Sequence, residues 1–474
     1  MLVVISDLHF EEEISYTIPA GDGYDQVRFT RNLPAKAFAR FISDLAAEAI
    51  RNKARRLDLV YAGDIFEITR TPLWWEGDEM LAKPYLPANQ AGTATEARVL
   101  HILDAIAAPG STVNDVLSIF QRLGRGFYVD IPEMYEKEFP VPVYLHYLPG
   151  NHDRHANATP AIRRKVRQLL GMPDSPAPFP NVIPFQAERT LVRHGHEYDY
   201  INFNQDLREE KTIPMHLPNA DYMAAPLGDF VALQFAARMG PLFRAYHSDE
   251  HIRRDPLLRR VYLRILEFDD LRPQSAVLNF MLNIPDPRFT RRDIWSKALE
   301  PVAKILLDEL HDHPFLLYWL DRLDKKWQLD TVDIIQGVLK LQPWSLLGVP
   351  LGVLQEASDQ ALSSIRENNP VAALAARESV IQTGEMLYVV AGHTHRPDVA
   401  LLKCDQHGER YYVDTGTWRN RVLATPDFTG FGRQKSLTYV TIYGPDEDQG
   451  FPPQPGKISS VDYWSGLTQR WPAH

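Results

Sequence analysis

The chain has 474 residues, of which 45% are hydrophobic and 24% are charged, and its formal net charge is −10. These values are ordinary for a soluble globular protein that buries a large core. The acidic balance disfavours attraction of the whole surface to nucleic acid or to an anionic membrane. A single cysteine, Cys404, excludes a framework of intramolecular disulfides. Neither a secretory leader nor an apolar run of membrane-spanning length is found, so we expect a cytoplasmic protein.

The first β pattern is a short aliphatic run over residues 2–5, which is typical of a strand buried on both faces. Asp7 and His9 follow this run directly. Side chains two residues apart point the same way in extended backbone, so these two could converge on one point. Taken alone, the same residues would also fit an ordinary surface loop.

A helix and a second buried strand follow, predicted over residues 35–56 and 57–62, and Gly63-Asp64 comes directly after this strand. Strand, helix and strand in this order are typical of an α/β fold, in which ligands bind at the carboxyl ends of the strands. Further along, the pattern predicts helices over 93–107, 112–123 and 160–170, and strands over 141–148, 182–184 and 188–193.

Two of these later strands also end in metal-binding residue types. The strand over 141–148 stops at Pro149-Gly150, and Asn151, His152 and Asp153 follow. Proline and glycine break a strand and let the backbone approach another group closely, although the same residues also fit a polar turn. The strand over 188–193 is followed by His194 and His196, which compete for one role.

The middle of the chain differs in composition from both flanks. Residues 203–384 show little β pattern and a helical periodicity that includes a helix predicted over 371–382. A strand then resumes at 386–390, followed by Gly392-His393-Thr394-His395. We therefore predict a core formed by 1–202 and 385–474, with 203–384 as a helical insertion or cap. We expect the insertion to shape substrate choice without supplying metal ligands. Further strands are predicted over 410–414 and 436–443, and an irregular tail after Gly444.

The residues that follow the strands make one mixed set of oxygen and nitrogen donors. The set consists of Asp7, His9, Asp64, Asn151, His194, His393 and His395, with His152 beside it. Without a thiolate, it suits divalent Mn, Fe, Zn, Co or Ni better than a structural zinc site. Seven ligands are too many for one tetrahedral ion, but they suit two ions that share a bridging carboxylate. Such a pair can polarise a phosphoryl oxygen and hold a bridging hydroxide.

In its order along the chain, this set resembles the calcineurin-like metallophosphoesterase superfamily. The residues that carry the resemblance are Asp7, His9, Gly63-Asp64, Gly150 to Asp153, His194 and Gly392 to His395. The resemblance implies a four-layer αββα sandwich of two mixed sheets flanked by helices, with a dimetal site at one edge. It assigns Asp7, His9 and His395 to the first metal, Asp64 to the bridge, and Asn151, His194 and His393 to the second. His152 would be the general acid.

Each of four further residues could belong to the site or have no role in it: His196, Glu67, Arg154 and Arg419. The family pattern places the ligand directly before a glycine, which favours His194 over His196. Glu67 lies three residues after Asp64, and it could orient His152 or begin an exposed helix. Arg154 and Arg419 could contact the substrate phosphate bidentately, or they could simply be solvated.

The substrate is the least determined part of the interpretation. Gly63 to Glu67 and Asp414 to Trp418 are similar to the UDP-diacylglucosamine hydrolase branch, but the insertion is longer and His152 stands where that enzyme has arginine. Apolar runs over 315–320 and 344–347 could line a pocket or form the insertion's own core. We expect a dimetal phosphoesterase that hydrolyses a phosphomonoester, phosphodiester or pyrophosphate of a small-molecule or nucleotide-type substrate. The alternatives are a nuclease for single-stranded nucleic acid, which the acidic charge weakens, and a non-catalytic scaffold that docks through the insertion.

Overall fold

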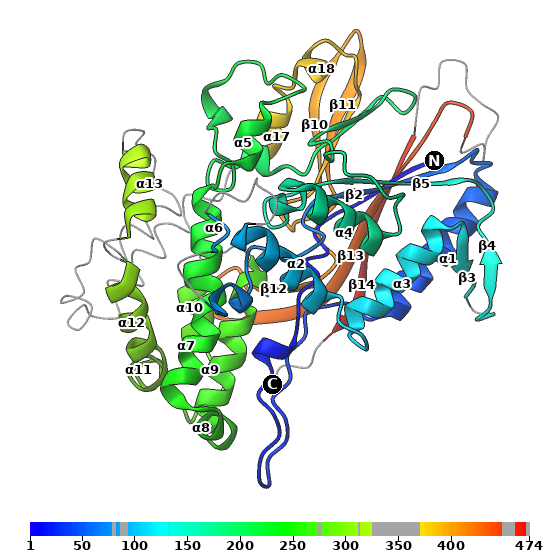
Figure 1. The fold of residues 1–474 in the computed structure, drawn as a ribbon. Coiled ribbons are helices and arrows are strands. Elements are labelled where there is room, and N and C mark those ends of the chain that lie inside the picture. Colours follow the sequence, from blue (N-terminus) through cyan, green and yellow to red (C-terminus); the bar gives the residue numbers. More distant parts are fainter. Residues whose placement is uncertain are drawn as a thin grey trace.

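Two mixed β-sheets lie at the centre of the structure, and helices surround them (Figure 1). This computed structural model describes residues 1–474 except 78–81, 86–92, 132, 273–275, 311–312, 325–369, 448–459 and 471–474. The predicted α/β class is confirmed. Among the described residues, no helix combines the length and the hydropathy that a membrane crossing requires.

The larger sheet is built around three parallel strands from the first third of the chain. Its order is β5-β2-β1-β13-β12-β8, and β14 also pairs with β13. Strands β5, β2 and β1 are parallel, whereas β13 runs antiparallel to β1, to β12 and to β14. The strands are β1 (Leu2–Ile5), β2 (Leu57–Ala62), β5 (Val143–Leu148), β8 (Leu271–Arg272), β12 (Asn420–Ala424), β13 (Phe431–Tyr443) and β14 (Ser460–Arg470).

The smaller sheet has the order β10-β11-β9-β7-β6. Its three central strands, β11, β9 and β7, are parallel to one another. The strands are β6 (Ile183–Phe185), β7 (Thr190–Val192), β9 (Tyr388–Ala391), β10 (Asp398–Asp405) and β11 (Gly408–Asp414). A separate hairpin pairs β3 (Phe127–Val129) with β4 (Glu136–Glu138).

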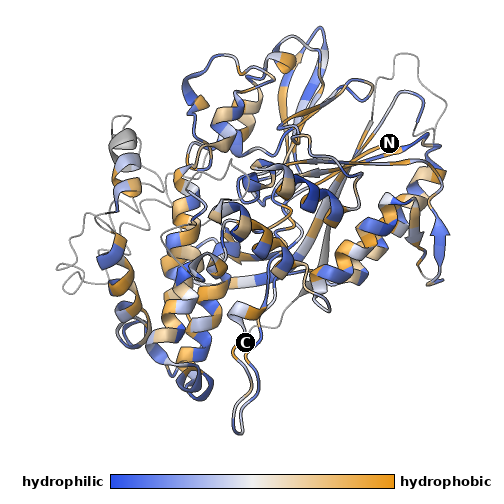
Figure 2. Cartoon of the chain, in the orientation of Figure 1, coloured by the Kyte–Doolittle hydropathy of each residue, from blue (hydrophilic) through white to orange (hydrophobic). Residues whose placement is uncertain are grey.

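Alternate residues of each central strand face two different hydrophobic cores. Val4 and Val60 of the larger sheet share one buried cluster with Val192 and Val390 of the smaller sheet. Their neighbours on the opposite face pack against helices, as Val3 does in the cluster that includes Phe38. These helices are α1 (Ala35–Arg51), α2 (Ala94–Ile106), α3 (Thr112–Gly124) and α4 (Pro160–Leu170). In Figure 2, hydrophobic and hydrophilic residues alternate around the helices, as expected where one side is buried.

The described part of the middle stretch is mainly helical, and most of its helices gather at the side of the molecule away from α1 and α3 (Figure 1). Its helices are α5 (Asn219–Met223), α6 (Leu227–Val231), α7 (Arg238–His247), α8 (Asp249–Arg254), α9 (Pro256–Glu267), α10 (Val277–Leu282), α11 (Arg291–Ile294), α12 (Glu300–Leu310), α13 (Pro314–Asp324), α17 (Pro370–Ala375) and α18 (Ser379–Gln382). Leu316 and Trp319 are buried among these helices, so this apolar run contributes to a core. The other run, 344–347, lies outside the described residues.

The predicted secondary structure omits strands β3, β4, β10 and β12, and three further differences concern the middle stretch and the tail. The single helix expected up to residue 382 is broken between α17 and α18, because Ile213 pairs with the backbone there: its N–H donates to Arg377 O, and its carbonyl accepts from Ser379 N. The middle stretch contributes strand β8 to the larger sheet. The tail after Gly444 is not wholly irregular, because β14 pairs along β13. Because prolines and glycines precede β14 in the sequence, the pattern there predicted an irregular tail and no strand.

Candidate metal centre

The predicted ligands all follow the carboxyl ends of parallel strands. Asp7 and His9 follow β1, Asp64 follows β2 and Asn151 follows β5. In the smaller sheet, His194 follows β7, and His393 and His395 follow β9. Because the two sheets share one buried cluster, these strand ends meet at a common edge.

The backbone at this edge adopts a conformation that residues other than glycine rarely use. Five predicted ligands have positive φ angles: Asp7 (53°), His9 (43°), Asp64 (53°), His393 (73°) and His395 (57°). A non-glycine residue in this region costs about 1–2 kcal/mol, and such strain concentrates at functional sites. The surrounding fold therefore holds these side chains in place against their local preference.

Three glycines explain how the loops approach the side chains so closely. A Cβ atom added to Gly392 would lie 2.2 Å from Asp7 Oδ2, and one added to Gly150 would lie 2.2 Å from Asp64 Oδ1. A Cβ atom on Gly63 would lie 2.5 Å from the Nδ1 atom of His194, and Gly63 also has a positive φ angle. A side chain at any of these positions would displace a predicted ligand.

Asp7, His9 and His395 form the first group that could hold a metal ion. The Nε2 atoms of His9 and His395 are 2.9 Å apart. Asp7 Oδ1 lies 3.3 Å from His395 Nε2 and 3.7 Å from His9 Nε2, and it is buried without a hydrogen-bond partner. A buried carboxylate oxygen without a donor is costly unless a cation lies beside it.

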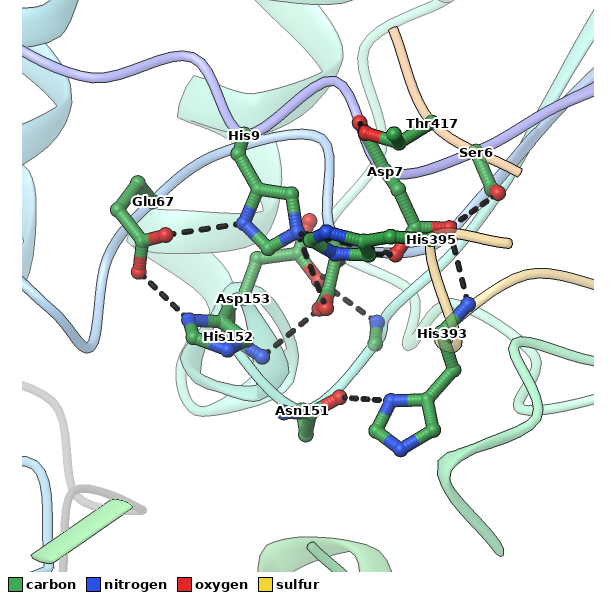
Figure 3. A network of polar contacts seen from close by, with 12 residues as sticks. Ser6, Asp7, His9, Glu67, Asn151, His152, Asp153, His393, His395 and Thr417 are labelled. Atoms are coloured by element: carbon green, nitrogen blue, oxygen red, sulfur yellow. Dashed lines mark hydrogen bonds and ion pairs between the residues drawn. The ribbon is translucent and has the colours of Figure 1, made fainter. Parts of the chain in front are cut away.

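Asp64, His194 and His393 form the second group, and Asn151 contacts both of its histidines. Asp64 Oδ2 is 3.1 Å from His194 Nε2. Asn151 Oδ1 is 3.0 Å from His393 Nδ1 (Figure 3). It is also 3.2 Å from His194 Nε2. Asp64 Oδ2 is also 3.7 Å from His9 Nε2 in the first group, so this carboxylate lies between the two groups.

Fixed acceptors determine which nitrogen of three histidines faces the centre. His194 Nδ1 donates to Ala62 O (2.8 Å), His9 Nδ1 donates to Glu67 Oε2 (2.9 Å), and His393 Nε2 donates to Asp199 Oδ2 (3.0 Å). The remaining nitrogen of each neutral ring then presents a lone pair toward carboxylate, amide or imidazole atoms. Lone pairs that face one another are stabilised by a proton or a metal ion between them, so these donors could hold a metal ion.

His395 differs from the other three histidines because Arg272 contacts it. The Arg272 guanidinium donates to His395 Nδ1 at 2.7 Å. If His395 is to bind a metal through Nε2, Nδ1 must carry the proton, and the guanidinium must then turn away from this ring. Burial and the positive charge of Arg272 hold the pKa of His395 well below its ordinary value.

The carboxylates of the centre raise the pKa of two of its histidines. Although burial opposes the charged form, the carboxylates of Asp64 and Asp7 raise the pKa of His194 to about 10. Burial likewise opposes the charged form of His152, but Glu67 and Asp64 raise its pKa to about 9. The site therefore favours positive charge at its centre, as the donor set requires.

Glu67 joins one predicted ligand to the predicted acid. It is fully buried, and its two carboxylate oxygens accept hydrogen bonds from His9 Nδ1 (2.9 Å) and His152 Nδ1 (2.6 Å) (Figure 3). Of its two readings, the structure shows the buried glutamate that orients His152. The side chain of His152 is 17% exposed, whereas that of His9 is fully buried.

Asp153 is a supporting residue to which the sequence pattern gave no role. Its carboxylate accepts hydrogen bonds from the backbone amides of Gly150 (2.6 Å), Asp64 (3.2 Å) and Ile65 (2.8 Å). It thereby ties the loop after β5 to the loop after β2. The sequence signal for this residue was its position directly after His152, within Gly-Asn-His-Asp.

A second set of missed residues supports Asp7 from the loop after β11. Thr417 Oγ1 donates to Asp7 O at 2.7 Å, and Ser6 Oγ, which contacts Thr415 Oγ1 at 2.5 Å, donates to Asp7 Oδ2. The backbone amide of His393 donates to the same Oδ2 at 2.9 Å. The Asp-Thr-Gly-Thr-Trp segment of the sequence therefore positions a ligand.

The two predicted phosphate-binding arginines are committed to other partners. Arg154 donates to Asp229 Oδ2 (2.7 Å), to Met223 O (2.9 Å) and to Pro84 O, so a substrate phosphate would have to displace these contacts. Arg154 also lines a small cavity. Arg419 is buried behind Glu67, and its Nε atom lies 2.9 Å from Asp270 Oδ1.

His196 does not join either ligand group. It is buried, its Nδ1 atom lies 3.5 Å from Glu197 Oε2, and burial lowers its pKa to about 4. The second ligand group contains His194 instead. Within the described part of 203–384, no residue belongs to a group that could hold a metal, although Arg272 touches His395.

Comparisons of the sequence with protein-family models and with curated proteins found no match. The resemblance to the calcineurin-like metallophosphoesterases therefore stays a prediction, and the geometry of the site must support any function by itself.

Proposed function

We propose that this chain is a metal-dependent phosphoesterase of the calcineurin-like metallophosphoesterase type. The observation that carries the proposal is the position of Asp64 between two histidine-containing groups, 3.7 Å from His9 Nε2 and 3.1 Å from His194 Nε2. A carboxylate shared in this way suits two divalent ions. When bound, the two ions would polarise a phosphoryl oxygen and lower the pKa of a water molecule between them.

The proposed architecture is a four-layer αββα sandwich with a helical insertion. The buried cluster shared by the two sheets supports the inner layers, and helices packed on the outer faces support the outer ones. The pairing of Ile213 with Arg377 and Ser379 supports an insertion that leaves and rejoins the core at one point.

The proposed ligands are Asp7, His9 and His395 for one ion and Asn151, His194 and His393 for the other, with Asp64 shared. His152 would protonate the leaving oxygen, because Glu67 holds its Nδ1 atom and leaves Nε2 free. The backbone amide of His152 donates to Asp64 Oδ1 at 2.8 Å, which fixes the loop beside the shared carboxylate. His152 would thus act on the substrate and not as a ligand.

The proposal is tested by a substrate screen on the full chain loaded with Mn²⁺, Fe²⁺, Zn²⁺, Co²⁺ or Ni²⁺. The substrates are a phosphomonoester, a phosphodiester, a nucleotide sugar and single-stranded DNA. We expect metal-dependent hydrolysis of at least one phosphoester and its loss in Asp64→Asn. Hydrolysis of the DNA alone would instead favour a nuclease, and a metal-loaded protein that hydrolyses nothing would favour a scaffold.

A further inference from the structure

Three arginines lie on one side of the first ligand group without a carboxylate at ion-pair distance among the residues that the structure describes. Arg272 ends strand β8, Arg396 directly follows His395, and Arg421 lies in strand β12. All three come from segments beside the carboxyl end of β9. Three guanidinium groups without close acidic partners are unusual, because most buried or clustered arginines pair with an acid.

Strand register places Arg272 and Arg421 on the same face of the larger sheet. Leu271 pairs with Val422, and both belong to the same buried cluster on one face. Side chains alternate along a strand, so Arg272 and Arg421 both point to the opposite face. That face is the one toward His395, since Arg272 contacts this ring.

Arg421 is the most deeply buried of the three. Only 9% of it is exposed, and its Nε atom has no hydrogen-bond partner. Burial, followed by the positive charges of Arg272 and Arg396, lowers its pKa to about 10, and Asp414 and Tyr463 act in the opposite direction. A buried donor beside like charges is costly unless an anion compensates it.

Arg272 is held by neutral acceptors alone. Its guanidinium donates to Thr394 O (3.3 Å), to Asp269 O (2.7 Å) and to His395 Nδ1 (2.7 Å). The carboxylates of Asp269, Asp270 and Asp7 act on it only from beyond ion-pair distance. If His395 carries its proton on Nδ1, this guanidinium loses one acceptor and keeps a free pair of donors at the edge of the site.

We propose that Arg272, Arg396 and Arg421 bind a second phosphoryl group of the substrate, next to the one that reacts. This inference rests on the proposed phosphoesterase function and narrows it to pyrophosphate-type substrates. Guanidinium groups match phosphate oxygens bidentately, and an anion here would satisfy the unpartnered Nε of Arg421.

The kinetic test uses the metal-loaded full chain and two matched substrates. Bis(4-nitrophenyl) phosphate carries one anionic group, and the corresponding pyrophosphate diester carries two. We expect Arg421→Gln to lower kcat/KM on the pyrophosphate by about tenfold more than on the phosphodiester, because one charge-assisted contact is lost. Arg421→Lys should restore part of the difference. Arg40→Gln is the control, because Arg40 is exposed and pairs with Asp44 at the surface.

Arg396→Gln provides a second variant that should fold, because Arg396 is exposed. A binding test on the metal-free full chain, by calorimetry with inorganic pyrophosphate, separates this inference from the proposed function. We expect both glutamine variants to bind pyrophosphate more weakly than the wild-type chain. If neither substrate is hydrolysed but this loss of binding is observed, the phosphoesterase function is wrong and the anion site stands. Equal kinetic losses on both substrates, or unchanged pyrophosphate binding in folded variants, would overturn the anion site.

Discussion

Gly392 has no side chain, and this leaves room for the Asp7 carboxylate of the first ligand group. A Cβ atom at this position would lie 2.1 Å from Ser6 Oγ and 2.2 Å from Asp7 Oδ2, whereas an ordinary contact begins near 3.4 Å. The substitution Gly392→Ala must therefore move the Asp7 carboxylate by about 1 Å. Gly392 has no positive φ angle, so the effect is steric and not conformational.

The size of the effect follows from two terms. Forcing one methyl group into a filled site costs about 1–3 kcal/mol of stability. Changes that disturb the orientation of a ligand typically lower metal affinity about 10–100-fold. We expect weaker binding at the first ion position and a smaller effect at the second, because the added Cβ atom would overlap Asp7 and not Asp64.

The assay is metal titration by calorimetry, combined with thermal unfolding of the metal-free chain. Gly432→Ala is the matched control, because a Cβ atom at Gly432 would meet nothing within 4 Å. A folded Gly392→Ala protein that binds metal with wild-type affinity would refute the reasoning. Equal losses in both variants would show that the effect is not local to Asp7.

Two further predictions concern His152 and Glu197. His152→Ala should keep its bound metal and lose about 10²–10⁴-fold in kcat on alkyl esters, but much less on nitrophenyl esters, which need no proton; equal losses over a series of leaving groups, or a lost ion, would contradict this role. Although burial opposes its charged form, His196 and Arg193 lower the pKa of Glu197 from 4.5 to about 2. A lowered folded-state pKa stabilises the fold above about pH 4.5, and this contribution is lost as the pH falls. Between about pH 6 and pH 2, the free energy of unfolding measured with urea should therefore fall by up to about 3 kcal/mol less for Glu197→Gln than for the wild-type chain. An equally steep fall in both proteins would refute this expectation.

The sequence predicted the parts of the fold that depend on local pattern. The aliphatic runs of β1, β2 and β9 are buried on both faces, and they mark their own ends by polar residues. The capping of α2 is also local, because the Thr93 side chain accepts a hydrogen bond from the backbone N–H of Glu96, three residues later. The structure brings the residues after these strands together because parallel strands end at one edge.

Other features depend on contacts between distant parts of the chain. Arg272 lies in a stretch that reads as helical, and only the pairing of β8 with β12 brings it to His395. Arg154 and Arg419 were plausible phosphate ligands as loop arginines. Their partners, Asp229 and Asp270, come from the middle stretch, and no local pattern indicates these ion pairs.

The central claim is that Asp64 joins two metal positions. The most direct measurement is elemental analysis of the metal-loaded full chain and of Asp64→Asn, each after removal of unbound metal. We expect two ions per wild-type chain, and weaker binding of fewer ions in the variant. The asparagine side chain is neutral and has a single oxygen, so it cannot bridge two ions as a carboxylate does. One ion or fewer in the wild-type chain, or two tightly bound ions in Asp64→Asn, would contradict the dimetal centre.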